Sequence, residues 1–389
     1  MIPHAGLRAA VRAGLCYSLA GAAESRVFRP WGPDLERMSE HEQQTSRPGP
    51  GRGCFRALFS GMGLSALSVT LVFLLLEGVL RMSQPHGDRP FDGTVYAVHA
   101  PPELISAFTW DGQGNSLAHV RSSNPVLVYE MRPGVRLNDF ISINSHGFRD
   151  GEYAQEKPAD VFRICAIGDS VTFGWWQRLE ETYPKVLEGL LAARAGKGPR
   201  YEVLNMGVGG YNAEQEAELF ASRVLRFQPD LLLVQYCEND HMIGQDAGLW
   251  RHFTRSGSRA WDWISLRALQ IRKMAAGGIL RPAYERIARV AGEHGIPVAA
   301  VIFHPCEPRR SGAVTRVAEM CAGLGFTVVD LWLLNERPDL KETFADFIHP
   351  TVLGHRIAAE EILRRLDESG LLGGPPAGDS GGAPAGSVL

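Results

Sequence analysis

From residue 161 onward, short apolar runs alternate with stretches in which apolar residues recur at intervals of three and four. Continuous apolar runs are typical of strands covered on both faces; these runs lie at 162–167, 201–206, 230–236, 297–303 and 326–330. The periodic stretches predict helices; they lie at 181–195, 213–227, 281–294, 314–324 and 352–366. This alternation predicts an α/β domain at 161–368, with a flavodoxin-like, doubly wound, parallel five-stranded sheet between two layers of helices.

Upstream of this domain, an uncharged run of twenty residues begins at Ala57 and ends at Leu76. As a helix it would span roughly 30 Å, which is the hydrocarbon thickness of a bilayer. The run has no polar face, and no Ala-x-Ala-like cleavage site follows it. We therefore predict a transmembrane helix at 57–76, with a buried core helix and a signal peptide as the alternatives. More arginines precede the run than follow it, which predicts a cytoplasmic N-terminus and a main domain in the periplasm or outside the cell.

The segments around these two elements have the composition of irregular or disordered chain. Residues 1–56 are rich in Arg, Gly and Pro without a sustained apolar period, and residues 373–389 hold mostly Gly, Pro, Ala and Ser, so we predict disorder in both. A start codon at Met38 or Met62 is an alternative for the N-terminal segment. Residues 85–150 mix turn residues with short β-like pieces, which predicts an irregular or β arm.

The charges of the chain nearly balance, with 40 basic and 43 acidic residues and a formal net charge of −3. Because there is no overall basic field to hold a polyanion, we exclude nucleic-acid binding. Six cysteines are too few for a disulfide scaffold, and none lies in a Cys-x-x-Cys pair that would indicate zinc. We therefore expect neither a metal nor another cofactor, although Cys306 and Cys321 could pair in an oxidising compartment. Nothing in the sequence indicates a protein partner.

Candidate chemical groups follow three of the predicted strands and precede the last helix. In such a sheet, ligands bind outside the carboxyl ends of the strands. Ser170 follows the first strand, Asn239 follows the third, and Asp346 and His349 precede the last helix. The second strand is followed by glycines at 207, 209 and 210. Each group alone suits a helix cap or a turn, but together they suit one mechanism at one edge of the sheet.

That mechanism is nucleophilic acyl transfer. His349 can take the proton of the Ser170 hydroxyl, and Asp346 can hold the imidazole in the required tautomer. The negative charge of the tetrahedral intermediate needs prearranged donors. The candidates for this oxyanion hole are the backbone N–H groups of Ser170 and Gly210 and the side-chain amide of Asn239.

The four motifs resemble those of the SGNH, or GDSL-type, serine esterase superfamily over residues 163–366. The segment 144–150 is also similar to the corresponding part of its membrane-anchored bacterial branch. The resemblance implies the SGNH hydrolase fold at 161–368. It also implies Ser170 as the nucleophile, Gly210 and Asn239 in the oxyanion hole, and Asp346 and His349 as the rest of the triad.

The sequence departs from the family pattern at two positions. Val171 replaces the leucine of the first motif, which changes little chemically. The third motif usually reads Gly-x-Asn-Asp, whereas here Glu238 directly precedes Asn239. A carboxylate in the oxyanion hole would oppose the developing charge, so we expect Glu238 to turn toward an arginine or solvent. The choice of Gly210 over Gly207 and Gly209 stays open.

Other side chains at the same edge could contact the substrate. Trp175 and Trp176 follow the nucleophile closely, His241 follows the third motif, and His304 ends the fourth strand. Packing explains the tryptophans equally well, and lone histidines are more often structural. An insertion at 241–278, rich in Trp and Arg, predicts either a lid over the site or an amphipathic cover on the sheet edge.

These observations predict a membrane-anchored serine esterase. Its substrate class would be O-acyl groups on carbohydrate or lipid. Two alternatives remain open: an O-acyltransferase that uses the same acyl-enzyme to modify an envelope polysaccharide, and a non-catalytic domain of the same fold that binds glycan.

Overall fold

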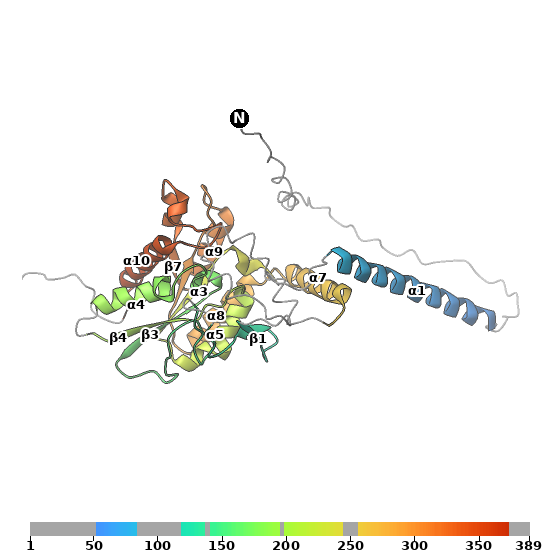
Figure 1. Cartoon of the computed structure of the whole chain (residues 1–389), viewed down its shortest axis with the longest axis horizontal. Helices are drawn as coiled ribbons and strands as arrows, with labels where there is room; N and C mark the ends of the chain where they lie inside the picture. Colours follow the sequence, from blue (N-terminus) through green and yellow to red (C-terminus); the bar gives the residue numbers. More distant parts are fainter. Residues whose placement is uncertain (1–51, 84–117, 137–140, 195–197, 244–255, 373–389) are drawn as a thin grey trace, which may run out of the picture. The chain divides into compact units, whose positions relative to one another are not determined.

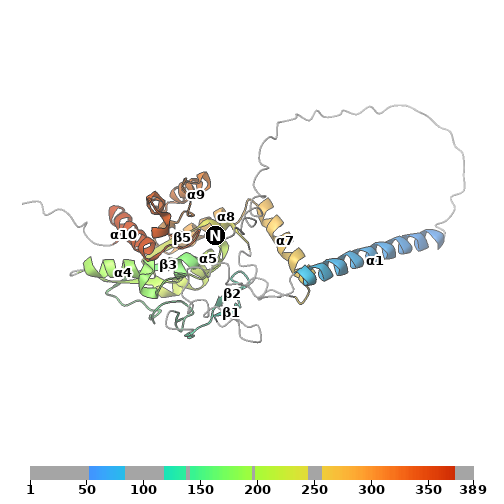
Figure 2. The ribbon, with the colours of Figure 1, turned by 45° about the horizontal axis from the view of Figure 1, so that its top comes forward.

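The computed structural model describes residues 52–83, 118–136, 141–194, 198–243 and 256–372 (Figure 1). Of the predicted disorder, residues 1–51 and 373–389 lie outside the described residues, whereas 52–56 belong to a helix. Residues 85–117 and 137–140 of the predicted arm also lie outside the described residues. Of the arm, the described part holds two short antiparallel strands, β1 (His119–Arg121) and β2 (Tyr129–Met131) (Figure 2).

A parallel five-stranded sheet forms the centre of the main domain, as predicted. Its strands are β3 (Val161–Ile167), β4 (Arg200–Asn205), β5 (Leu231–Tyr236), β6 (Val298–Ile302) and β7 (Thr327–Asp330). The strand order is β4-β3-β5-β6-β7, so the chain first adds a strand on one side of β3 and then continues on the other. This order is that of the flavodoxin-like fold, in which β3 ends at the topological switch point. The end of β3 is therefore where a ligand site is expected.

Helices cover both faces of the sheet, which confirms the predicted layers. The principal helices are α4 (Tyr183–Arg194), α5 (Ala213–Ser222), α8 (Leu280–Glu293), α9 (Gly312–Gly323) and α10 (Val352–Glu368). The apolar residues of α5, α8 and α9 pack in one core cluster, and those of α4 and α10 pack in a second. Side chains alternate along β3 between the two cores, with Cys165 and Ile167 in the first and Ile164 and Ala166 in the second. Because both faces are buried, these strands are almost uniformly apolar.

Two helices differ from the predicted elements. The turn after β3 forms the single-turn helix α3 (Ser170–Phe173), which is too short for periodicity to reveal. The second is α7 (Arg259–Ala275), in the insertion that was predicted as a lid or cover. Its start is capped by Ser258, whose hydroxyl accepts the N–H of Trp261.

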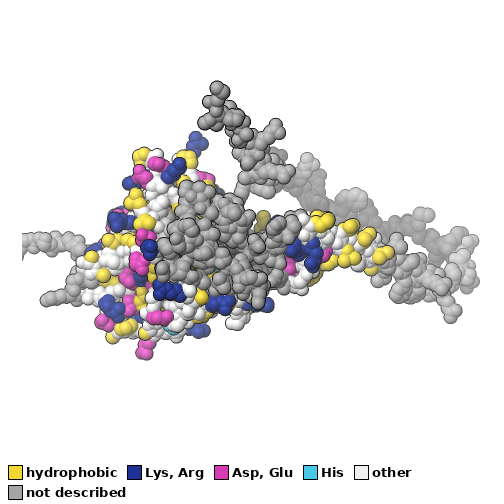
Figure 3. Space-filling model, in the orientation of Figure 1, with side chains coloured by type: hydrophobic (Ala, Val, Ile, Leu, Met, Phe, Trp, Pro, Cys, Tyr) yellow, Lys and Arg dark blue, Asp and Glu magenta, His cyan; other side chains and the backbone are white. Residues whose placement is uncertain are grey.

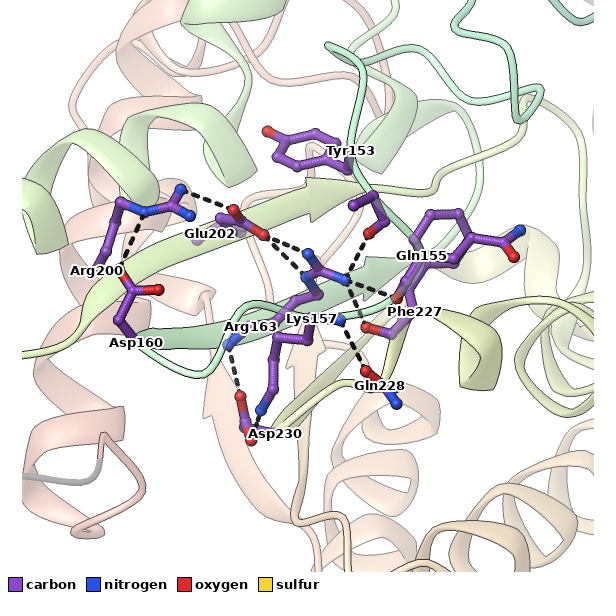
Figure 4. Close-up of polar contacts among 12 residues, drawn as sticks. Tyr153, Gln155, Lys157, Asp160, Arg163, Arg200, Glu202, Phe227, Gln228 and Asp230 are labelled. Atoms are coloured by element: carbon purple, nitrogen blue, oxygen red, sulfur yellow. Dashed lines mark hydrogen bonds and ion pairs between the residues drawn. The ribbon is translucent and has the colours of Figure 1, made fainter.

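A buried ion pair joins the two strands at one side of the sheet (Figure 4). Arg163 on β3 binds Glu202 on β4 through two N–H groups, at 2.9 and 2.7 Å. The same guanidinium donates to the carbonyl oxygens of Ala154, Gln155 and Phe227. Because Arg163 is only 1% exposed, these oxygens replace the water that a guanidinium otherwise binds. Through its bonds to Ala154 and Gln155, Arg163 attaches the segment before β3 to the sheet.

The N-terminal helix α1 (Arg52–Ser83) is longer than the predicted 57–76 in both directions. Its stretch Ser65–Met82 has a mean hydropathy of 1.7 and is long and apolar enough to cross a membrane. Most leucines and all valines of this stretch are exposed, as the hydrophobic side chains on the coloured part of the helix show (Figure 3). A core helix would bury such side chains, so this finding disfavours that alternative.

Candidate active site

A tight turn between β3 and α3 carries Ser170. A Cβ on Gly168 would lie 2.2 Å from Thr172 Oγ1 and 2.3 Å from Gln235 Oε1, so only glycine fits there. Gln235 Oε1 accepts the backbone N–H of Asp169 at 3.1 Å and the Thr172 hydroxyl at 3.0 Å. The neighbouring strand β5 therefore holds the turn in place, and Ser170 stands at the carboxyl edge of the sheet.

The structure brings Ser170, His349 and Asp346 together at this edge. His349 Nε2 lies 2.8 Å from Ser170 Oγ, and His349 Nδ1 lies 2.8 Å from Asp346 Oδ2. Asp346 Oδ1 accepts the backbone N–H groups of Ile348 and His349, at 2.9 and 2.8 Å. Burial alone would raise the pKa of Asp346, but the hydrogen bonds from His349 and Ile348 outweigh it, so the pKa lies well below its ordinary value.

The ionised state of Asp346 determines the tautomer of the imidazole. An ionised carboxylate only accepts hydrogen bonds, so His349 Nδ1 must carry the proton that faces Asp346. In the neutral imidazole, Nε2 then carries no proton and can accept the hydroxyl of Ser170. In this arrangement His349 can act as a base toward Ser170.

The side chain of Asn239 lies beside the turn that carries Ser170 and is hydrogen-bonded to that turn. Its amide nitrogen donates to Asp169 Oδ2 and, at 3.4 Å, to the carbonyl oxygen of Tyr211. Asp169 Oδ1 accepts the N–H of Val171, so this carboxylate links the first and third motifs and braces the turn. Cys237 Sγ also donates to Asp169, at 3.0 Å. The Asn239 amide thus has a defined position, 4% exposed, before any substrate binds.

The three glycines after β4 differ in their surroundings. A Cβ on Gly207 would lie 2.4 Å from the backbone nitrogen of Phe173, so Gly207 allows α3 to pack closely. Gly209 faces the ring of Trp175, which would lie 3.3 Å from a Cβ. Gly210 has a φ of 78°, in the left-handed region that favours glycine. Packing and ring contact explain the first two, which leaves Gly210 as the candidate for an oxyanion-hole N–H.

Residues 166–357 match the model of the GDSL-like Lipase/Acylhydrolase family. They form a GDSL-type acylhydrolase domain, of the SGNH esterase family. The match begins within β3 and ends within α10, and it includes Ser170, Asn239, Asp346 and His349.

The solved structures with a similar fold include three esterases, each at low identity to this chain. A catalytic mutant of the acetylxylan esterase Axe2 from Geobacillus stearothermophilus is 18% identical over 52% of this chain and 93% of that chain, with a TM-score of 0.37. The psychrotrophic esterase EstA from Pseudoalteromonas sp. is 12% identical over 54% and 98%, with a TM-score of 0.38. A two-domain esterase active on acetylated mannans is 16% identical over 54% and 49%, with a TM-score of 0.39. No curated protein matches the chain.

Trp175 and Trp176, expected as a wall of the substrate pocket or as packing residues, contact the triad itself. The indole N–H of Trp176 donates to Asp346 Oδ2 at 3.1 Å. The ring of Trp175 stacks on the His349 imidazole, with the ring planes 24° apart and the centroids 6.4 Å apart. Their place in the sequence indicated nearness to Ser170, but nothing in it indicated a bond to a carboxylate 170 residues away.

The two candidate histidines are held by other contacts. His304 is 1% exposed, and its Nε2 lies 2.8 Å from Asp330 Oδ1 at the end of β7. His241 is exposed, and its Nε2 lies 3.1 Å from the Tyr236 hydroxyl. Nearby protein atoms partly desolvate the imidazole of His241, which lowers its pKa although the side chain reaches solvent. These contacts indicate a structural role for His304 rather than contact with substrate. His241 remains an exposed side chain after the third motif.

Glu238 is exposed, which confirms that this carboxylate turns toward solvent. Nearby protein atoms partly desolvate the carboxylate, which together with the charge of Glu307 raises the pKa of Glu238. Cys306 and Cys321, which the sequence left as a possible disulfide, are both free thiols. Among the residues that the structure describes, no group of three or more His, Cys, Asp or Glu side chains could hold a metal ion.

The described part of the predicted lid, 256–278, is mostly the helix α7, while 244–255 lies outside the described residues. Helix α7 is tied to the domain by Lys273, which pairs with Glu214, and by Gln270, which donates to the carbonyl oxygen of Ile243 at 3.0 Å. It exposes several large apolar side chains; these are Trp261, Trp263, Ile264, Ile271 and Met274. Helix α7 is therefore amphipathic, as both a lid over the site and a cover on the sheet edge would be.

Proposed function

We propose that the acylhydrolase domain cleaves carboxylic esters through an acyl-enzyme on Ser170. The observation that carries this proposal is the hydrogen-bonded chain from Ser170 through His349 to Asp346. His349 Nε2 takes the proton from Ser170 as its oxygen bonds to the carbonyl carbon of the ester. The tetrahedral intermediate expels the alcohol, which receives that proton. Water, activated by the same imidazole, then releases the carboxylic acid and restores the serine.

The oxyanion hole consists, in this proposal, of the N–H groups of Ser170 and Gly210 and the amide of Asn239. These donors come from three different strand ends. The backbone N–H groups of Ser170 and Gly210 are fixed by the fold and need no reorganisation when charge develops. The amide of Asn239 exchanges its weaker bond, to the Tyr211 carbonyl at 3.4 Å, for the oxyanion. The substrate class is an O-acyl group on carbohydrate or lipid.

The experiment is hydrolysis of p-nitrophenyl acetate by the full chain in detergent. We expect Ser170→Ala and His349→Ala each to lower kcat by at least about a thousandfold, because a triad acts as a unit. The matched controls are Ser369→Ala and His294→Ala, near the ends of α10 and α8, which should retain full activity. Undiminished turnover in either triad variant, with folding verified by circular dichroism, would defeat the proposal. Product analysis with a labelled acyl donor and a polysaccharide acceptor separates hydrolysis from acyl transfer.

We also propose that α1 anchors the chain in a membrane, with the N-terminus in the cytoplasm and the acylhydrolase domain in the periplasm or outside the cell. The exposed apolar stretch Ser65–Met82 supports the anchor. The arginines at 47, 52 and 56 support the orientation. Substrates would then be esters at the cell envelope. The protein would belong to the membrane-anchored branch of its family.

A further inference from the structure

We propose that Trp176 is a positioning residue of the catalytic triad. Its indole N–H holds Asp346 in place and reduces the effective charge that this carboxylate presents to His349. The inference rests on the proposed function, because it assigns a role in the proposed reaction. It concerns a residue whose nearness to the nucleophile in sequence had suggested contact with the substrate instead.

The first argument is the set of donors around Asp346. A carboxylate offers about four lone-pair sites, and four donors meet this one. Oδ1 accepts the N–H groups of Ile348 and His349, while Oδ2 accepts His349 Nδ1 and Trp176 Nε1. Three of these donors belong to the short segment 346–349 itself. Trp176 comes from the segment that follows the nucleophile, so its bond ties the Asp–His loop to the Ser170 loop.

The second argument is the backbone of Trp176. Its φ is 76°, in the left-handed region that a bulky aromatic residue rarely adopts. Such a conformation persists only where surrounding contacts impose it, and it is commonly found at functional sites. Here it follows Gly174, which has a φ of 80°. The local chain therefore departs from its preferred conformation at the residue whose indole reaches Asp346.

The contacts that impose this conformation come mainly from a buried guanidinium. Arg149 is 1% exposed and donates to the carbonyl oxygens of Phe173, Gly174 and Gln177, at 2.9, 2.6 and 2.6 Å. Gln177 in turn donates to the carbonyl oxygen of Pro350 at 3.1 Å, directly after His349. The turn that carries Trp176 is thus fixed on both sides, and its geometry does not depend on the indole bond alone.

The third argument is the position of the imidazole between two indoles. The Trp175 ring stacks on His349, and the Trp176 ring meets it edge-on, with the planes 79° apart and the centroids 6.3 Å apart. Removal of the Trp176 N–H would therefore change the charge near His349 while an aromatic ring at 176 could still pack against it. Packing and electrostatic roles can be separated by experiment.

The electrostatic effect has a definite sign. An N–H dipole directed at Asp346 offsets part of its negative charge, so its loss leaves that charge more available to stabilise the imidazolium of His349. The protonated, inactive form of the base then persists to higher pH. We expect the acid limb of the kcat/KM profile to move to higher pH, and kcat to fall roughly tenfold as the carboxylate loses a fixed partner.

The other charged or titratable groups near Asp346 and His349 are the same in the protein altered at position 176 and in the parent. Burial lowers the pKa of His355 to about 3, so it stays neutral. Burial and the charge of Asp346 raise the pKa of the Cys306 thiol. Arg149 keeps its charge, since burial lowers its pKa only to about 10. A shifted acid limb therefore reports the change at position 176.

The test compares two replacements in the full chain. Trp176→Phe removes the N–H and shortens the ring. A benzothiophene analogue of tryptophan at 176, introduced by nonsense suppression, replaces the N–H with sulfur and keeps the shape. Trp332→Phe is the control, because this ring packs on His304 and Arg310 and its replacement leaves the Trp176–Asp346 bond in place.

We expect both replacements at 176 to shift the acid limb upward and to lower kcat with KM nearly unchanged, whereas Trp332→Phe leaves the limb in place. An unshifted limb in the benzothiophene protein overturns the inference, even if Trp176→Phe does not fold. Failure of the proposed function looks different, because Ser170→Ala would then retain turnover. If Ser170→Ala is inactive and the limb does not move, only the role of Trp176 is wrong.

Discussion

Asp169 shows how a single side chain can join two sequence motifs. One of its oxygens caps α3 through the N–H of Val171, and the other accepts the amide of Asn239. The carboxylate therefore orients the amide of Asn239, the proposed oxyanion donor, and also stabilises the turn that carries Ser170. A capping role for Asp169 could be predicted from its position before a helix start. Its bond to Asn239 could not, because the partner lies 70 residues away.

The Asn239 amide gives the first prediction at this scale. In the proposed mechanism it donates to the tetrahedral intermediate, so Asn239→Ala should lower kcat by about a hundredfold to a thousandfold with little change in KM. Steady-state kinetics with p-nitrophenyl acetate measure both quantities. Asn124→Ala is the control, since the amide of this asparagine donates to Glu218 on α5. A loss confined to KM would show that Asn239 binds the ground state instead.

Glu216 illustrates what residue type alone does not reveal. It lies on the amphipathic helix α5, where a glutamate is normally solvated, yet it is completely buried. Burial and the neighbouring charge of Asp169 raise its pKa well above the ordinary value. Helical periodicity predicted α5 correctly, but the side of the helix on which this glutamate lies was decided by packing against the rest of the domain.

At the scale of elements, the buried pair of Arg163 and Glu202 connects β3 to β4. Glu202→Ala would leave a buried guanidinium without its carboxylate, and we expect a loss of about 3–5 kcal/mol in the free energy of unfolding. Urea denaturation followed by circular dichroism measures this loss. The control Glu293→Ala breaks an exposed pair with Arg289, and it should cost less than about 1 kcal/mol. Equal losses in the two variants would contradict the assignment of Arg163 as a structural anchor.

The elements themselves were largely predictable. Five strands and five helices follow from apolar runs and periodicity, and the structure confirms them with ends shifted by a few residues. The exceptions have physical causes. The predicted helix at 213–227 is interrupted after Ser222, and its last part, Val224–Phe227, is a short 3₁₀ helix. Helix α7 was missed because its apolar residues face solvent and alternate with arginines, which weakens the pattern of a buried face.

At the scale of the whole molecule, the proposed topology predicts the side of the membrane on which the domain lies. Alkaline phosphatase fused behind the full chain in a bacterial host should be active, and a green fluorescent protein in the same place should be dark, because the fusion point is outside the cytoplasm. The same reporters fused before α1 should give the opposite pattern. An inactive phosphatase and a fluorescent green fluorescent protein at the C-terminal end would show that the orientation is the opposite of the one proposed.

The sequence by itself determined which residues could act and at which edge of the sheet they lie. The carboxyl ends of parallel strands share one edge, so the order of strands and motifs suffices to place Ser170, Asn239, Asp346 and His349 near one another. Only the tertiary structure decided how they are bonded: Trp176 to Asp346, Asn239 to Asp169, and Arg163 to Glu202. The reason is that these bonds join residues far apart in the sequence. Hydrophobic periodicity reports the environment of a residue along its own element, whereas these bonds depend on the distances between elements and on the orientation of their side chains.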